Sequence, residues 1–289
     1  MSQRPQVLAV HGRGLLPFQT PLLSGDDLGV TRGDGCFDAL RVTADPSGAR
    51  AHFVTAHLER FARSAAALGI ATPPVAQWRE LIDEALAAWA WPGEAICKVV
   101  LTRGLESGPS EPVGYLTITA APDFSRVRRG VSAVTLDRGY AHDAFAAAPW
   151  LLGGVKTLSY AVNVAAQRAA RIAGVDEAVF RSSDALLLEG PTAGLLYARD
   201  DALWTTPVTG SGVLPSVTIA ELFSVAAAQG VRTGAAFLPA GEARTCDGVW
   251  LVSAIRGVVP VLELDGVELR HFADVTSTLA AAVGFPRID

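Results

Sequence analysis

The stretch Gly153-Gly154-Val155-Lys156-Thr157-Leu158-Ser159-Tyr160 decides how the rest of the chain is interpreted. Lysine is scarce, since only Lys98 and Lys156 occur among 24 lysine and arginine residues. Lysine differs from arginine in that its amine can lose a proton when desolvated and then attack a carbonyl. Lys156 follows two glycines and precedes a predicted helix, which suits a catalytic side chain. Lys98 lies inside an apparent strand, 95–103, where an outward-facing side chain is the simpler interpretation.

Composition excludes several classes of protein. The 289 residues carry a net charge of −5 without a large cluster of Lys and Arg, which argues against nucleic-acid binding. No stretch approaches the roughly 18 to 20 apolar residues of a membrane span, and Met1–Pro5 is not followed by a signal-type apolar run. We therefore expect a cytoplasmic protein with no membrane partner. Its three cysteines and five histidines are too scattered for a disulfide framework or a metal site.

Hydrophobic patterning predicts an α+β protein in two domains. The first domain, 1–121, has predicted helices at 56–68 and 75–90, followed by β-branched strands at 95–103 and 114–121. The segment 122–130 contains Pro122 and three arginines without an apolar period, so we expect an interdomain linker there. The second domain, 131–289, mixes short strands with predicted helices near 159–173, 218–229 and 273–283. Half of all residues are hydrophobic, which favours burial against a second copy in a homodimer.

Three other features could support chemistry, although each has an ordinary structural interpretation. Ser216-Val217-Thr218 opens a predicted helix, and Thr218 and Glu221 have capping-box spacing, so this helix start is either an ordinary cap or an anion site. Glu189 ends an apolar run before a turn, and Arg60 lies on the first helix, where exposure is the default. Together with Lys156 they supply what pyridoxal phosphate needs: a lysine for the Schiff base, a carboxylate for the pyridine nitrogen and an anion cradle.

The order of these features resembles the fold-type IV pyridoxal-phosphate enzymes, namely branched-chain aminotransferases, D-amino-acid aminotransferases and aminodeoxychorismate lyases. The segments that carry the resemblance are Arg32–Asp38, His57–Arg60, Lys156–Tyr160, Asp176–Ala178, Glu189–Thr192, Gly212–Thr218 and Ser253–Val261. The resemblance implies a small N-terminal α/β domain, a larger C-terminal α/β barrel-like domain and pyridoxal 5′-phosphate between them. It also implies a homodimer whose active site borrows a loop from the partner.

The resemblance assigns roles to individual residues. Lys156 would form the Schiff base and shuttle the proton, and Glu189 would pair with the pyridine nitrogen. Arg60 would bind the phosphate, together with amides and a hydroxyl of Val217 and Thr218. Tyr160 would approach the ring oxygen.

Three positions depart from the family pattern. Gly194 stands where an Asn often follows the Glu-Gly-Pro-Thr turn, and Ser216 replaces a common Gly. Ala254 stands where aminotransferases often have a phosphate-binding Thr, which leaves only its backbone amide for the cofactor.

The activity that the resemblance favours is the lyase reaction, because 98–104 and 115–120 look like the lyases. The enzyme would convert 4-amino-4-deoxychorismate to 4-aminobenzoate and pyruvate, with Arg103 bound to a substrate carboxylate. Asp38 and Ser253 are also expected at the substrate. Thr102-Arg103-Gly104 resembles the D-amino-acid aminotransferases too, and Asp38 falls where aminotransferases tend to have Glu and a lyase has Thr. An aminotransferase acting on D-amino or branched-chain amino acids is therefore the alternative, and a non-catalytic cofactor-binding module is a third.

Overall fold

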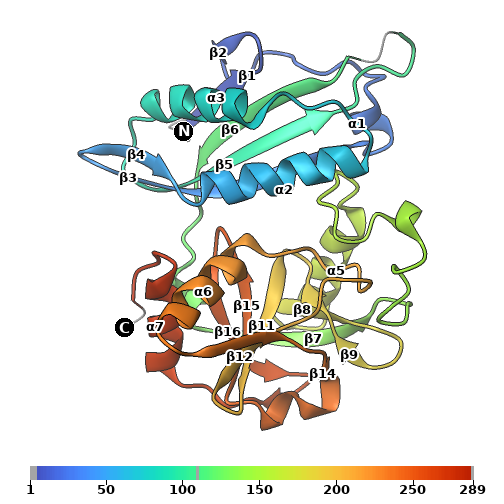
Figure 1. The fold of residues 1–289 in the computed structure, drawn as a ribbon. Helices are drawn as coiled ribbons and strands as arrows, with labels where there is room; N and C mark the ends of the chain where they lie inside the picture. The colour runs from blue at the N-terminus through green and yellow to red at the C-terminus, as the bar shows by residue number, and fades with distance from the viewer. Residues whose placement is uncertain (1–4, 109–110, 288–289) are drawn as a thin grey trace. The chain divides into compact units, whose positions relative to one another are not determined.

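The computed structural model describes residues 5–108 and 111–287, which fold into two compact units (Figure 1). Unit 1 comprises Met1–Pro122 and Val155–Tyr160, and unit 2 comprises Asp123–Gly154 and Ala161–Asp289. The outermost ends of the two predicted domains, 1–4 and 288–289, lie outside the described residues. The short lysine segment at 155–160 thus groups with unit 1, although its flanking residues belong to unit 2.

Unit 1 is built on a six-stranded antiparallel sheet, with strand order β2-β1-β6-β5-β3-β4. Its elements are β1 (Gln6–Val10), β2 (Gly14–Leu16), α1 (Leu28–Thr31), β3 (Gly35–Asp45), β4 (Gly48–Ala51), α2 (Val54–Ala67), α3 (Val75–Ala87), β5 (Gly93–Thr102) and β6 (Val113–Ala120).

One face of this sheet forms the core of unit 1. Alternate residues of β3, including Cys36 and Leu40, are fully buried, because successive side chains of a strand point to opposite faces. They pack in one cluster with Leu58 and Phe61 of α2 and with Trp78 of α3. The spacing of the apolar residues of α2 predicted this helix correctly, because its buried residues recur every three or four positions.

Unit 2 contains most of the helices and an eleven-stranded mixed sheet. Its elements are α4 (Ser125–Arg129), β7 (Val131–Asp137), η1 (Pro149–Leu151), α5 (Ala161–Ile172), β8 (Glu177–Arg181), β9 (Leu186–Leu187), β10 (Glu189–Gly190), β11 (Ala193–Arg199), β12 (Ala202–Thr205), α6 (Val217–Ala228), β13 (Arg232–Ala235), β14 (Leu238–Pro239), η2 (Ala240–Thr245), β15 (Gly248–Ser253), β16 (Gly257–Leu264), β17 (Val267–Glu268) and α7 (Ala273–Ala282).

The sheet of unit 2 curves back on itself. Its main order is β13-β12-β11-β15-β16-β7-β8-β9-β14, and β7 runs parallel to both β16 and β8. The short strand β10 pairs with β11 and also packs against β8, although β11 and β8 are separated by three strands in the sheet order. This closure agrees with the predicted barrel-like form and places the end of the Glu189 run inside unit 2.

The predicted linker at 122–130 is the main departure from the expected organisation. Residues 125–129 form α4, and 123–130 belong to unit 2. Val127 of α4 packs against the core of that unit, which supplies the burial that no apolar period in the sequence indicated. Among residues 5–108 and 111–287, no helix is both long and apolar enough to span a membrane.

Candidate functional site

Lys156 is held on the edge of β3 by backbone hydrogen bonds. Phe37 N donates to Lys156 O at 3.1 Å, and Leu158 N donates to Gly35 O at 2.8 Å. Lys156 N donates in turn to Ser64 Oγ of α2 at 3.2 Å. The residue that carries the amine is therefore fixed by a strand and a helix of unit 1, as a reactive group requires.

Two glycines of the Arg32–Asp38 segment make this docking possible. A Cβ on Gly35 would lie 2.5 Å from Leu101 O and 2.7 Å from Leu158 Cδ1, so no side chain fits there. Gly33 has a φ of +68°, in the left-handed region, and a Cβ on it would lie 3.1 Å from Ser159 N. The glycines of the motif thus serve the close approach of the lysine segment.

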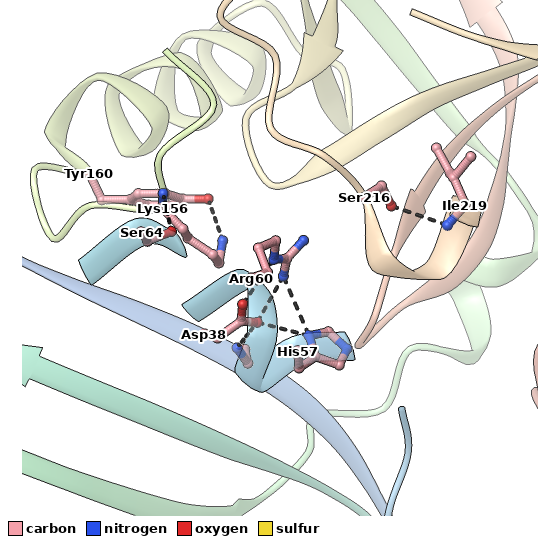
Figure 2. Close-up of polar contacts among 9 residues, drawn as sticks. Asp38, His57, Arg60, Ser64, Lys156, Tyr160, Ser216 and Ile219 are labelled. Carbon is pink, nitrogen blue, oxygen red and sulfur yellow. Dashed lines mark hydrogen bonds and ion pairs between the residues drawn. The ribbon is translucent and has the colours of Figure 1, made fainter. Parts of the chain in front are cut away.

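The Lys156 amine lies among aromatic rings. Its Nζ is 4.4 Å from the ring centroid of Phe37 and 5.2 Å from that of Tyr160, and the two rings meet edge to face. Nζ also lies 3.5 Å from Tyr160 Oη, as Figure 2 shows. Lys98 is exposed on β5, as the sequence predicts, and its Nζ lies farther from the Phe37 ring, at 5.8 Å. The flanking rings restrict water around the Lys156 amine, which favours nucleophilic and proton-transfer chemistry.

Arg60 belongs to a buried ionic group with Asp38 and His57 (Figure 2). Its Nε donates to Asp38 Oδ2 at 2.9 Å and its Nη2 to Oδ1 at 2.8 Å, while His57 Nδ1 lies 2.9 Å from Oδ1. Burial alone would favour the neutral acid, but the charge of Arg60 and the hydrogen bonds from His57 and Arg60 hold the pKa of Asp38 well below its usual range. The default expectation of an exposed Arg60 is wrong, because only 7% of the residue is exposed.

Asp38, which is expected at the substrate, lies with its side chain fully buried. It is bonded to Arg60 and His57, so it orients the guanidinium. Arg103 is also engaged within unit 1: its Nε and Nη2 bind Asp34 at 2.6 and 3.1 Å, and Nη2 reaches Leu68 O at 2.6 Å. The Asp34 hydrogen bond raises the pKa of Arg103 above its ordinary value. A substrate carboxylate that took the same fork of Arg103 would replace Asp34.

Glu189 lies in unit 2, at the start of β10, with only 14% of its side chain exposed. Leu214 N donates to its Oε2 at 3.1 Å, and Arg138 Nη1 lies 3.7 Å from its Oε1. Arg138 directly follows β7 and has no local motif around it, so it could not be recognised from the sequence. The carboxylate is thus fixed by a backbone amide on one oxygen and a cation beside the other.

The N-terminus of α6 differs in detail from its prediction. Ser216 is the N-cap, and its Oγ accepts from Ile219 N at 3.3 Å, so the predicted capping box of Thr218 and Glu221 is wrong. Val217 and Thr218 are the first two residues of the helix and both are buried. Their position is that of residues whose amides can bind an anion at a helix start.

The turn between β15 and β16 contains Ser253 and Ala254. Ser253 Oγ accepts from Arg256 N at 3.2 Å, so this hydroxyl helps to close the turn. Arg128 donates from Nη2 to Ile255 O at 3.3 Å and from Nε to Arg256 O at 3.1 Å. These contacts hold the carbonyl groups of Ile255 and Arg256, the two residues that follow Ala254 in the turn.

Each unit carries donor groups of kinds that suit pyridoxal 5′-phosphate. Unit 1 carries a fixed amine, Lys156, and an oriented guanidinium, Arg60. Unit 2 carries a fixed carboxylate, Glu189, and the helix start at Val217 and Thr218. These are the groups that suit an aldehyde, a pyridine nitrogen and a phosphate. Within the described residues, no three His, Cys, Asp or Glu side chains gather to hold a metal ion.

Comparisons with known proteins agree with this donor set. The family described as Amino-transferase class IV matches residues 35–264. The chain is 36% identical over 275 residues to a protein named bifunctional aminodeoxychorismate lyase / D-amino acid transaminase from Mycobacterium tuberculosis, covering 91% of this chain and 92% of the relative. Among solved structures, the fold IV-transaminase CpuTA1 from Curtobacterium pusillum is similar with a TM-score of 0.90 and 36% identity, covering 96% of this chain and 97% of the other. A hypothetical aminotransferase from Mycobacterium tuberculosis in a PLP-bound form gives a TM-score of 0.90 and 34% identity, covering 97% and 99%.

Proposed function

Because the chain belongs to the class IV aminotransferases, whose cofactor is pyridoxal 5′-phosphate, we propose that it is a lyase that converts 4-amino-4-deoxychorismate to 4-aminobenzoate and pyruvate. The bound cofactor supplies an electron sink that stabilises negative charge at the carbon bearing the substrate amine. The residues of the chain hold the cofactor, orient the substrate and move the proton.

The placement of the Lys156 amine is the observation that carries the proposal. Lys156 is attached to β3 through Phe37 and Gly35, and its Nζ lies against the rings of Phe37 and Tyr160. A fixed and partly desolvated amine can form the bond to the cofactor aldehyde and can later accept and return a proton. In the proposed reaction, Lys156 removes the proton from the carbon that bears the amine, and then acts as the acid. Loss of pyruvate leaves an aromatic ring, which drives the reaction forward.

Six other residues are proposed to hold the cofactor, one of them, Ala254, through its backbone amide. Glu189 pairs with the pyridine nitrogen, and Tyr160 approaches the ring oxygen. Arg60 binds the phosphate, and Asp38 keeps its guanidinium in one orientation. The helix start at Val217 and Thr218 adds amides and a hydroxyl for the same anion.

The phosphate also has a backbone partner in the turn after β15. Ala254 offers only its amide there, in place of the hydroxyl of a threonine. Loss of one hydroxyl contact weakens binding by an amount typical of a hydrogen bond to a charged group, about 1.5–3 kcal/mol.

Substrate contacts are proposed for Arg103 and Ser253. Arg103 can bind a carboxylate of the substrate with its planar fork once Asp34 is exchanged, since both acids present the same two oxygens. Ser253 contributes through its hydroxyl, which already lies at the turn beside Ala254.

D-amino-acid transamination is the second candidate. The relative from Mycobacterium tuberculosis bears both activities in its name, and it is similar over nine-tenths of this chain. Both reactions begin with the same proton removal by the lysine, so one site can support either. We propose this activity as the alternative, ahead of one on branched-chain amino acids.

Two assays on one preparation of purified protein test the proposal. The first supplies aminodeoxychorismate and follows 4-aminobenzoate, and the second supplies D- or L-amino acids with pyruvate or 2-oxoglutarate and follows the transferred amine. We expect 4-aminobenzoate, and transamination alone would replace the lyase by the second candidate. Absence of both, with cofactor bound, would leave a non-catalytic binding module.

The variant Lys156→Ala controls for the assignment of the amine. We expect it to lose the visible absorbance band of the bound cofactor and every activity. Lys98→Ala is the matched variant, because Lys98 is exposed, and it should keep the band. An unchanged spectrum in Lys156→Ala would overturn the role of Lys156.

A further inference from the structure

Arg138 has no role in the proposed activity, yet its guanidinium lies close to a proposed cofactor ligand, Glu189. Its Nη1 lies 3.7 Å from Glu189 Oε1, while the other carboxylate oxygen accepts from Leu214 N. Nη1 is buried and has no hydrogen-bond partner in the part of the chain that the structure describes. A buried donor without a partner costs about 1–3 kcal/mol, so stability alone does not explain this placement.

Aromatic rings hold the Arg138 guanidinium beside the carboxylate. Its Cζ lies 5.2 Å from the ring centroid of Phe145 and 5.7 Å from that of Phe180. Phe145 enters a slot between two glycines: a Cβ on Gly153 would overlap its ring, and one on Gly212 would lie 2.6 Å from it. Gly153 of the stretch before Lys156 therefore serves to seat the ring that positions Arg138.

β10 packs against β8 and β11, and the charged side chains on these two strands have partners of their own. On β8, Glu177 binds Arg256, and Arg181 lies 3.9 Å from Asp137. On β11, Arg199 binds Glu242 at 3.2 Å. Arg138, in contrast, places its Nη1 3.7 Å from the Glu189 carboxylate.

We propose that Arg138 is a positioning residue that keeps the Glu189 carboxylate ionised and oriented for the ring nitrogen of the cofactor. Removing a carboxylate from water favours its neutral form, and a cation within about 4 to 6 Å favours the charged form. Only the ionised carboxylate can stabilise a proton on the pyridine nitrogen. This inference rests on the proposed pairing of Glu189 with that nitrogen.

The experiment measures the dissociation constant of pyridoxal phosphate between pH 8 and pH 5 for wild type, Arg138→Met and Arg138→Lys. Methionine keeps an apolar chain between the two rings and removes the charge. In Arg138→Met, Glu189 takes up a proton at higher pH than in wild type, and that proton must be released when the cofactor binds. The ratio of the mutant to the wild-type constant should therefore rise about three- to tenfold as the pH falls. Arg138→Lys should restore most of the wild-type profile.

The variant Glu189→Gln tests the pairing of Glu189 with the ring nitrogen separately from the role of Arg138. Glutamine does not titrate, so adding Arg138→Met to Glu189→Gln should leave the pH dependence unchanged. If Glu189→Gln binds the cofactor as tightly as wild type, the pairing with the ring nitrogen is wrong. If Glu189→Gln weakens binding but Arg138→Met follows wild type at every pH, the inference about Arg138 is overturned.

Discussion

In unit 1, the buried carboxylate of Asp38 determines the orientation of Arg60, a proposed cofactor ligand. Asp38 neutralises Arg60 and receives two of its donors, while His57 adds a third bond. An arginine so buried would pay a large desolvation penalty without a partner. Asp38 thus sets the direction of the group proposed to bind the phosphate, although it touches neither cofactor nor substrate in our proposal.

Removing the charge of Asp38 should destabilise the protein. We expect Asp38→Asn to lower the free energy of unfolding at pH 7 by about 3–5 kcal/mol, because the buried Arg60 charge loses its ion pair with Asp38. Urea denaturation measures this change. Glu59→Gln removes an exposed carboxylate from the same helix as Arg60 and should change stability by less than about 0.5 kcal/mol. Equal effects of both variants would contradict the role of the buried pair.

The same variant has a defined pH dependence. The pKa of Asp38 is lower in the folded protein than in the unfolded chain, so its stabilisation is complete above the unfolded value of about 4 and is lost as the pH falls below it. The difference in unfolding free energy between wild type and Asp38→Asn should therefore shrink from pH 7 to pH 3. A constant difference across this range would mean that the Asp38 charge is not what stabilises the fold.

At the scale of residues, the sequence identified groups with a distinctive chemical context and missed those that depend on distant partners. Lys156 stood out because lysine is scarce and glycines precede it. The burial of Arg60 was not predictable, because Asp38 lies 22 residues earlier on β3 and the strand register is set by the sheet. Arg138 was missed for the same reason, since the fold brings it to Glu189 from the end of β7.

At the scale of elements, two departures from the family pattern lie in contact. A Cβ on Gly194 of β11 would be 2.9 Å from Ile219 Cδ1 and 3.2 Å from Ser216 Cβ at the start of α6. The family often has an asparagine where this chain has Gly194. It often has a glycine where this chain has Ser216. The two changes therefore compensate each other in volume and keep the start of α6 packed on β11.

This compensation predicts a measurable coupling. Gly194→Asn alone should destabilise by about 1–3 kcal/mol through overpacking, and Ser216→Gly alone by a few tenths, roughly what a glycine N-cap costs. In the double variant the penalty should be smaller than the sum by at least about 0.5 kcal/mol, measured by urea denaturation. Gly241→Asn is the control, since nothing lies within 4 Å of its Cβ, and it should be additive with Ser216→Gly. Additivity of the Gly194 pair would contradict the compensation.

The spacing of apolar residues predicted individual elements better than it predicted which segments pair with one another. The predicted helix at 56–68 is α2, Val54–Ala67, because its apolar stripe alone defines the buried face. The return of 155–160 to β3 was not predicted, because its bonds to Gly35 and Phe37 join residues far apart in the chain. A helix at 125–129 was missed because five residues are too few to show a period.

At the scale of the whole molecule, the predicted family, the α+β fold in two units and the cofactor are confirmed. The prediction succeeded because several motifs occur in one order along the chain, which is more specific than any motif alone. No local motif in the sequence determines the oligomeric state or the cellular location. The homodimer and the cytoplasmic location therefore remain predictions.

Exposed apolar side chains give the homodimer a physical basis. Half of the residues are hydrophobic, and unit 2 exposes Trp150 at 74%, Val162 at 67% and Ile172 at 88% of their surfaces. Large side chains of this kind on a monomer favour burial against another chain.

We expect sedimentation velocity to give about twice the chain mass of 30.2 kDa at micromolar concentration. Ile172→Glu should shift the equilibrium toward monomer, because it would bury a charge in the interface, whereas Glu221→Gln on α6 should leave it unchanged. A monomer at every concentration would rule out the homodimer.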